Sequence, residues 1–235
     1  MSNDDLNDYS IDTHDDDSVL AKDHSTSDFS GNVRVYFRNL EAELCDHIGG
    51  ADLVVGCVAW LTNERILEAL AGVRGGVAIV VQKEDFLRPD LRSGSAWKPR
   101  LRAAYDRLPR VPERHAWPGL LGAMSTCSDP RVQPVRCVGN YNRDRAPAFP
   151  RMHNKFLVFC RASRQGHDLN IEPFEVWTGS FNLTYNASRS LENAVAISSE
   201  RIARAYFAEW EQIEAISEPL DWHCEWSAPQ WRIGS

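Results

Sequence analysis

Three short motifs in the second half of the chain carry the side chains that could do chemistry. They are His153-Asn154-Lys155, Gly179-Ser180-Phe181-Asn182 and Glu192-Asn193. A neutral imidazole can attack phosphorus and carry the phosphoryl group covalently, so His153 is a candidate nucleophile. Lys155 and Asn182 can stabilise the negative charge that spreads over the phosphoryl oxygens. A carboxylate such as Glu192 can fix the tautomer of the attacking histidine. Together these groups predict cleavage of a phosphodiester without a metal ion.

The spacing of His153 and Lys155 has a structural reason. Residues 155–160 form an apolar run that is typical of a buried strand, and side chains two apart on a strand point to the same face. Both side chains would therefore reach one phosphate at the start of that strand. Gly179 would allow a tight turn and a close approach of the backbone to a ligand. We expect residues 180–188 to form a helix whose amide groups can face an anion.

The order and local pattern of the motifs resemble the phospholipase D superfamily. The resemblance rests on RMHNKFLVF and VWTGSFNLTYNASRSLENAVAI, which are similar to the HxK, GSxxN and Glu-Asn signatures of that family, the second in the contracted form GSFN. Upstream, VRVYFRNLEAELCDHIGGADLVVGCVAWLTNERILEALAG resembles the family's opening strand, helix, strand and helix. The resemblance spans roughly residues 32–216 and leaves out 86–131. Cys160 stands where the family usually has an aspartate.

The resemblance implies a fold and a set of site residues. The fold would be α/β, a mixed β-sheet flanked by helices in a phospholipase D-like α/β/α sandwich. Catalytic roles would fall on His153, Lys155, Asn182, Ser180 and Glu192, and substrate-binding roles on Gly179 and Asn193. No metal and no cofactor is expected, because Lys155 would supply the positive charge that a metal ion would otherwise supply.

A single HxK motif implies a second copy of the chain. A phosphohistidine route needs a nucleophile on one side of phosphorus and an acid in line on the other side, to protonate the leaving oxygen. One histidine cannot occupy both positions. We therefore expect an isologous homodimer that places two copies of His153 face to face at one shared site.

The charge distribution favours a polyanionic partner. The formal net charge is −7, but residues 1–28 hold nine Asp and one Lys, while residues 88–151 hold thirteen Arg or Lys against five Asp or Glu. A basic segment next to the motifs favours nucleic acid, and we expect an endonuclease that acts on DNA or RNA. Two alternatives stay open: a phospholipid head-group hydrolase, and a catalytically silent nucleic-acid-binding module.

Composition divides the chain into three parts. Residues 1–30 are rich in Asp, Ser and Asn and predict an acidic disordered tail, which could compete with nucleic acid for the site. Residues 31–216 would form the catalytic domain, and the Trp-rich residues 217–235 would pack on it. We find neither a signal-peptide core nor an apolar run long enough to span a bilayer, and the six cysteines form no CxxC pair. These features predict a cytoplasmic protein without membrane association.

Apolar periodicity predicts the elements that hold the motifs. The expected strands are 33–37, 52–60, 77–81, 135–138, 155–160, 175–178 and 193–197, and the expected helices are 40–48, 63–71, 98–107, 180–188 and 201–216. A helix between strands 52–60 and 77–81 predicts a right-handed crossover and a parallel pair. The long connection 83–131 is rich in proline, and we expect it to shape the substrate groove.

Overall fold

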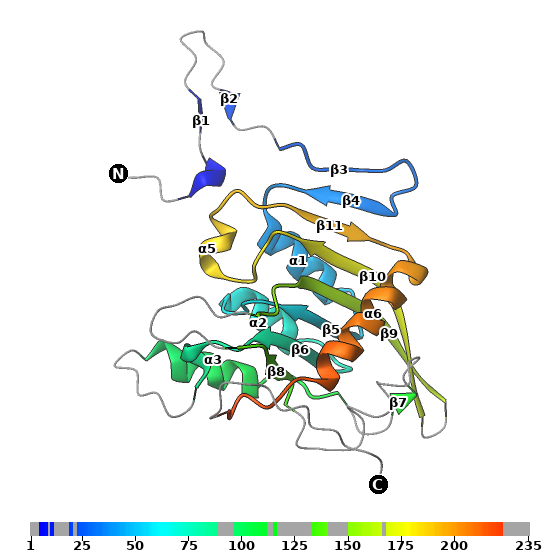
Figure 1. Ribbon diagram of the computed structural model, residues 1–235. Coiled ribbons are helices and arrows are strands. Elements are labelled where there is room, and N and C mark those ends of the chain that lie inside the picture. Colours follow the sequence, from blue (N-terminus) through cyan, green and yellow to red (C-terminus); the bar gives the residue numbers. More distant parts are fainter. Residues whose placement is uncertain are drawn as a thin grey trace.

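A mixed β-sheet forms the centre of the structure, which is a computed structural model. The structure describes residues 5–8, 10–11, 19–20, 23–88, 96–111, 115–116, 133–140, 150–165 and 168–222. Within these ranges a nine-stranded sheet has the order β3-β4-β11-β10-β9-β5-β6-β8, with β7 paired to β10 (Figure 1). The strands of this sheet are β3 (Thr26–Ser27), β4 (Val33–Tyr36), β5 (Leu53–Val58), β6 (Val77–Gln82), β7 (His115–Ala116), β8 (Val135–Val138), β9 (Lys155–Gln165), β10 (Asp168–Gly179) and β11 (Ala194–Ile197).

The sheet has a parallel half and an antiparallel half. β5, β6 and β8 pair in parallel, which confirms the predicted parallel pair. Every residue of β5 and β6 is buried, as strands covered on both faces must be, and their sequences LVVGCV and VAIVVQ are correspondingly apolar. From β9 onward the neighbours β9, β10, β11 and β4 pair antiparallel. The predicted mixed sheet is therefore confirmed.

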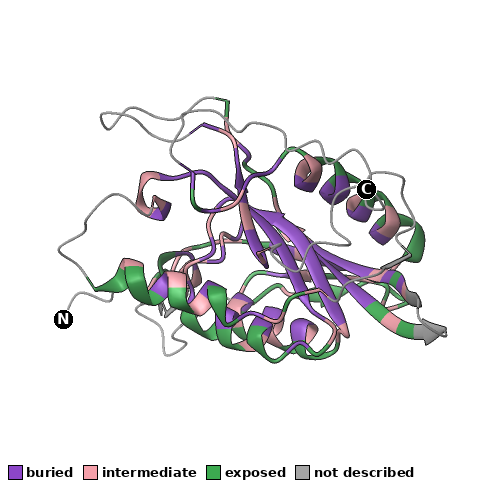
Figure 2. Ribbon diagram, turned by 90° about the horizontal axis from the view of Figure 1, so that it is seen from below, coloured by how far each residue is buried: buried purple, intermediate pink, exposed green. Residues whose placement is uncertain are grey.

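Helices cover both faces of the sheet. They are α1 (Leu40–Gly49), α2 (Glu64–Ala71), α3 (Trp97–Asp106), the short α5 (Tyr185–Ser188) and α6 (Glu200–Ala215). Figure 2 shows the buried strands between helices on either side. Apolar side chains of α1, α2 and α3 join one core cluster, and those of α6 join a second cluster on the opposite face. Burial of these two helix faces against the sheet is the main source of stability, because apolar area is removed from water on each side.

The helix predicted for residues 180–188 is wrong over its first half. Residues 180–184 are not helical, and the helix begins only at Tyr185, where the Thr184 hydroxyl accepts a hydrogen bond from the Ala187 amide. The reason is tertiary: the Leu183 amide donates to the Trp60 carbonyl, and the Leu183 carbonyl accepts from residues 62 and 63. These bonds hold the backbone in a bridge to the β5–α2 loop, so a helix cannot form there.

β9 and β10 are longer than their apolar runs predict. They form one antiparallel hairpin in which pairing continues to Asp168 and Gln165, beyond the buried residues. Apolar periodicity predicted only the mostly buried parts of the two strands, residues 155–160 and 175–178. The residues beyond them are more polar and are held in the hairpin by backbone pairing.

Parts of both terminal segments contact the sheet domain. In the acidic segment predicted to be disordered, β3 pairs with β4, and the turn η1 (Leu6–Asp8) lies against the end of α5, where the Asn7 side chain donates to the Ser188 carbonyl at 3.1 Å. In the C-terminal segment, Trp222 is buried in the first core cluster. Trp226 and Trp231 lie outside the described residues. The division into tail, catalytic domain and packing segment stays a prediction.

Candidate active site at one edge of the sheet

The three motifs meet at one edge of the sheet because of the strand register. Lys155, the first residue of β9, pairs with Val58, the last residue of β5. On the other side of β9, Phe156 pairs with Thr178 near the end of β10, and Gly179 in turn pairs with Ala194 at the start of β11. The ends of four neighbouring strands thus bring HxK, GSFN and the Glu-Asn pair together, although they are spread over 41 positions of the sequence.

His153 and Lys155 lie side by side, as their spacing predicts. The Lys155 Nζ atom is 3.3 Å from His153 Nδ1 and 3.2 Å from the His153 carbonyl oxygen. The imidazole is exposed and meets the Trp60 ring edge to face, with 5.7 Å between ring centroids. Burial lowers the pKa of His153, and the charges of Lys155 and Arg151 lower it further. The imidazole is therefore neutral near pH 7, which is the form that can attack phosphorus.

Burial also lowers the pKa of Lys155, while the negative charge of Glu192 acts in the opposite direction. The Lys155 side chain is only partly buried. Its ammonium group therefore faces the imidazole at the surface, where an incoming anion can reach both groups.

The GSFN turn and the Glu-Asn pair are tied together by hydrogen bonds. The Ser180 hydroxyl donates to a Glu192 carboxylate oxygen and accepts from the Asn193 amide at 3.1 Å and from the Asn193 side chain at 3.2 Å. A Cβ atom on Gly179 would lie 2.3 Å from the Asn193 carbonyl oxygen, so only glycine permits this approach. The close approach that we expected for Gly179 is thus to the backbone of Asn193 in the present structure.

This network changes the expected role of Glu192. The carboxylate was expected to orient His153, but it accepts from Ser180, and no carboxylate contacts the His153 ring among the residues that the structure describes. Asn182 differs from its neighbours, because its side-chain oxygen is buried without a hydrogen-bond partner in the described part of the chain. None of the hydrogen bonds among the described residues involves the Asn182 amide nitrogen either, so this NH2 group is the donor of the site that remains available to a phosphoryl oxygen.

A groove of about 630 Å³ extends from this cluster. Its lining has an aromatic group, Trp60, Phe86 and Trp97, and a polar group from the segment after β10, Asn182, Thr184, Asn186, Ser190 and Glu192. We call it the site groove. Phe86 and Trp97 belong to the long connection that was expected to shape the substrate groove, and they do line it.

Sequence reasoning missed Trp60, which belongs to both the cluster and the groove. The Trp60 indole nitrogen donates to the buried Glu84 carboxylate at 3.1 Å, and burial raises the pKa of Glu84. This bond orients the ring that packs against His153. The sequence placed Trp60 at the end of an apolar strand, but it did not show that this end lies beside His153. That position follows only from the register of β5 and β9.

Cys160, at the position of the family's usual aspartate, lies away from the site. It is fully buried in the second core cluster with residues of α6, on the face of the sheet opposite to Leu157 and Phe159. It is also five residues from Lys155 along β9, a distance of about 16 Å at roughly 3.3 Å per residue. Cys160 therefore fills the core and touches none of the site residues.

A second histidine–carboxylate pair is structural. His47 of α1 lies 2.6 Å from a Glu175 oxygen of β10, and Ser198 donates to the other oxygen of the same carboxylate at 2.5 Å. Burial acts to raise the pKa of Glu175, but the hydrogen bonds from His47 and Ser198 outweigh it and lower that pKa. Both members of the pair are largely buried, and they join α1 to the sheet.

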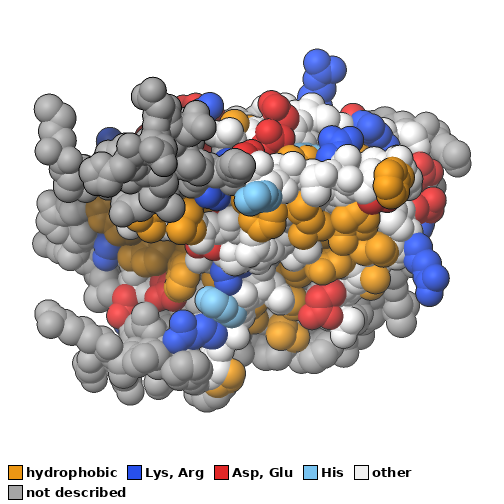
Figure 3. Space-filling model, turned by 90° about the horizontal axis from the view of Figure 1, so that it is seen from above, with side chains coloured by type: hydrophobic (Ala, Val, Ile, Leu, Met, Phe, Trp, Pro, Cys, Tyr) orange, Lys and Arg blue, Asp and Glu red, His pale blue; other side chains and the backbone are white. Residues whose placement is uncertain are grey.

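The chemical inventory of the described residues contains four free cysteines and no group of three or more His, Cys, Asp and Glu side chains that could hold a metal ion. None of the helices among these residues is long and apolar enough to cross a membrane. On the face seen in Figure 3, Lys and Arg lie among Asp and Glu and around exposed hydrophobic side chains. The basic excess of residues 88–151 falls largely on the described residues, which hold eight of the thirteen Arg or Lys and one of the five Asp or Glu.

Comparison with known proteins defines the class of the fold. No family model matches the sequence. The structure is similar to NucT from Helicobacter pylori, with a TM-score of 0.50 and 13% sequence identity over 80% of this chain and 98% of that one. It is also similar to Nuc, a phospholipase D family member from Salmonella typhimurium, with a TM-score of 0.45 and 19% identity over 79% of this chain and 95% of that one. The likeness to NucT shows that the two chains share a fold, an open mixed β-sheet flanked by helices, which is the fold class that the sequence predicts.

A nearer relative defines the family. The sequence is 33% identical over 210 residues to the uncharacterized protein L381 of Acanthamoeba polyphaga mimivirus. The aligned region covers 83% of this chain and 70% of that protein. The chain belongs to the same family as L381.

Proposed function

We propose that the protein is a metal-independent phosphodiesterase, an endonuclease that cleaves DNA or RNA through a phosphohistidine intermediate. The observation that carries the proposal is the convergence of His153, Lys155 and Asn182 at one sheet edge. These side chains supply a neutral nucleophile, a fixed cation and an uncommitted amide around one position. Those are the groups that a transferring phosphoryl group requires.

In the first step, a ring nitrogen of His153 attacks phosphorus. A nitrogen–phosphorus bond forms while the bond from phosphorus to the leaving oxygen breaks, and that oxygen takes a proton from His153 of a second copy, which enters this step as the imidazolium while the attacking ring is neutral. In the second step, the same second imidazole removes a proton from water, and the water oxygen displaces His153 from phosphorus. Lys155 and Asn182 hold the phosphoryl oxygens throughout. Ser180, Glu192 and Asn193 fix the turn that carries Asn182.

Exposure around the site supports the shared-site dimer. His153 is exposed, and Tyr185 and Leu191 are large hydrophobic side chains that are 61% and 60% exposed close to the motif residues in sequence. The exposure of His153 is what a site shared with a second copy requires, whereas single exposed apolar side chains are common on protein surfaces. Analytical ultracentrifugation tests the dimer: we expect a dimer at working concentrations, and a fully active monomer would overturn the shared site.

Nucleic acid is the proposed substrate because of the basic segment before the motif and the aromatic lining of the site groove. The four cysteines among the described residues are free, which supports a reducing compartment such as the cytoplasm.

The test is a cleavage assay in EDTA on single- and double-stranded DNA and RNA, with phosphatidyl lipids as a parallel panel. We expect cleavage of nucleic acid by the wild type and none by His153→Ala. Binding without any cleavage would establish a silent binding module instead. Cleavage of the lipids alone would establish a head-group hydrolase.

A further inference from the structure

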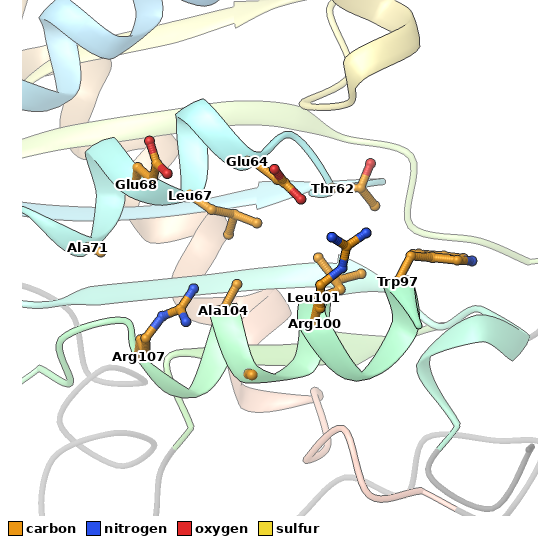
Figure 4. A pocket seen from close by; sticks show the side chains of 11 residues that line it. Thr62, Glu64, Leu67, Glu68, Ala71, Trp97, Arg100, Leu101, Ala104 and Arg107 are labelled. Carbon is orange, nitrogen blue, oxygen red and sulfur yellow. The ribbon is translucent and has the colours of Figure 1, made fainter. Parts of the chain in front are cut away.

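The site groove continues into a second depression that sequence reasoning did not foresee. This depression, of about 470 Å³, lies between α2 and α3 and shares Thr62 and Trp97 with the site groove. Figure 4 shows its lining: Trp97 stands at the start of α3, and Arg100 and Arg107 project from the same helix towards α2. The two depressions therefore adjoin at Thr62 and Trp97, and together they lead from Trp60, which packs against His153, to Arg100 and Arg107 of α3.

The aromatic side chains along this path are arranged as a platform. Phe86 and Trp97 are in contact, with ring centroids 5.4 Å apart and an interplanar angle of 45°. Trp97 is 40% exposed, which is unusual for a tryptophan that has a core available on either side of the sheet. Trp60 completes the group at the end that meets His153.

The remaining lining is polar. Residues 182–192 supply amide and hydroxyl groups, and in the second depression Arg100 and Arg107 of α3 face Glu64 and Glu68 of α2, with no ion pair between them among the described residues. The two arginines are therefore the groups of this depression that can contact a phosphate, on its α3 side. A lipid chain would leave these amides and hydroxyls without hydrogen-bond partners, so the lining disfavours it. Planar bases joined by phosphates fit both kinds of lining.

We propose that Trp97, Phe86 and Trp60 bind unpaired bases, so that the substrate is a single strand whose scissile phosphate lies at His153. This inference rests on the proposed function and names the substrate class of that same site. Base faces are free to stack on aromatic side chains in a single strand, whereas in a duplex each base is already stacked between its neighbours. The phosphates that follow the stacked bases would lie along Arg100 and Arg107.

Binding in EDTA tests the inference without requiring cleavage. Fluorescence anisotropy would compare the Kd of a labelled single strand of about ten nucleotides with that of a duplex of the same length. For Trp97→Leu we expect the Kd of the single strand to rise about tenfold, and that of the duplex to change by less than about twofold. Trp97→Phe keeps a ring and should restore most of the loss. Phe29→Leu is the matched control, because Phe29 is fully exposed and follows β3, the outermost strand of the sheet, away from Trp97.

An abasic substrate makes the test sharper. If a base stacks on Trp97, one abasic position in a scan outward from the scissile phosphate removes the same contact as Trp97→Leu, so at that position the two changes should not add. Additive losses, or an equal loss for single strand and duplex, would overturn the inference. The proposed function would survive either result as long as wild type cleaves in EDTA and His153→Ala does not.

Discussion

Replacing Lys155 by methionine removes the only motif side chain with a fixed positive charge. Its ammonium group lies 3.3 Å from the His153 ring, so it can reach a phosphoryl group bound to that ring. Loss of one preorganised donor to a developing negative charge typically lowers kcat by about 100- to 1,000-fold, or about 3–4 kcal/mol. We expect this loss for Lys155→Met, and a smaller loss for Lys155→Arg, which keeps the charge but changes the donor geometry.

The same variant should move the pH profile. Burial, then Lys155, then Arg151 lower the pKa of His153, so removal of the Lys155 charge should raise that pKa. The attacking imidazole must be neutral, and activity is lost as pH falls through the pKa of His153. The acidic limb of kcat/KM should therefore lie at higher pH in Lys155→Met than in wild type.

Two measurements check this reasoning: kcat/KM against pH in EDTA, and an NMR titration of the His153 ring in both proteins. Arg204→Met is the control, because Arg204 lies on α6 and pairs with Glu200 away from the site. The reasoning fails if Lys155→Met keeps more than about a tenth of the wild-type kcat, since one donor is worth far more than that. It also fails if the His153 titration does not move.

Three further predictions concern the frame around the site. Lys83→Met leaves the buried Glu218 carboxylate without its ion-pair partner and should lower the free energy of unfolding, measured by urea titration, by about 3–5 kcal/mol. The double variant Lys83→Met/Glu218→Leu should lose less, because it removes both charges. A loss below about 1 kcal/mol for Lys83→Met would contradict the buried pair. The pKa of Glu175 is lowered in the folded protein, so its contribution to stability is present above its ordinary pKa of 4.5 and is lost as pH falls through its pKa in the folded state. The difference in free energy of unfolding between wild type and Glu175→Gln should therefore shrink from about pH 7 to about pH 4. A difference that stays constant would refute this. Deleting residues 1–22 keeps β3 and should tighten nucleic-acid binding at low salt if the acidic tail competes for the site; unchanged affinity would remove that hypothesis.

Motif spacing could predict the composition of the site but not its internal bonds. HxK on an apolar strand and GSFN after another strand place His153, Lys155 and Asn182 correctly, because strand ends and glycine turns are local properties. The partner of Glu192 could not be predicted in this way. It depends on how closely the two backbones approach at Gly179, which follows from the register of β10 and β11.

The helices, like the site, could be predicted where local pattern decides the structure and not where tertiary contacts decide it. Periodicity predicts α1, α2, α3 and α6 to within one or two residues, because each buries one apolar stripe. It fails for residues 180–184, whose conformation is set by hydrogen bonds to the β5–α2 loop. The grouping of Trp60, Phe86 and Trp97 could not be predicted either, since Trp60 follows β5 and the other two follow β6, and only the parallel pairing of β5 and β6 brings the two connections to one edge.

Trapping the covalent intermediate tests the central claim most directly. Wild-type protein and His153→Ala would each be mixed with a labelled oligonucleotide in EDTA and quenched in alkali, in which a phosphoramidate survives, and the peptides would then be read by mass spectrometry. The proposed mechanism predicts a phosphoryl adduct on the peptide that contains His153 in the wild type and none in the variant. Cleavage that proceeds with no adduct on His153, or with the adduct on another residue, would contradict it.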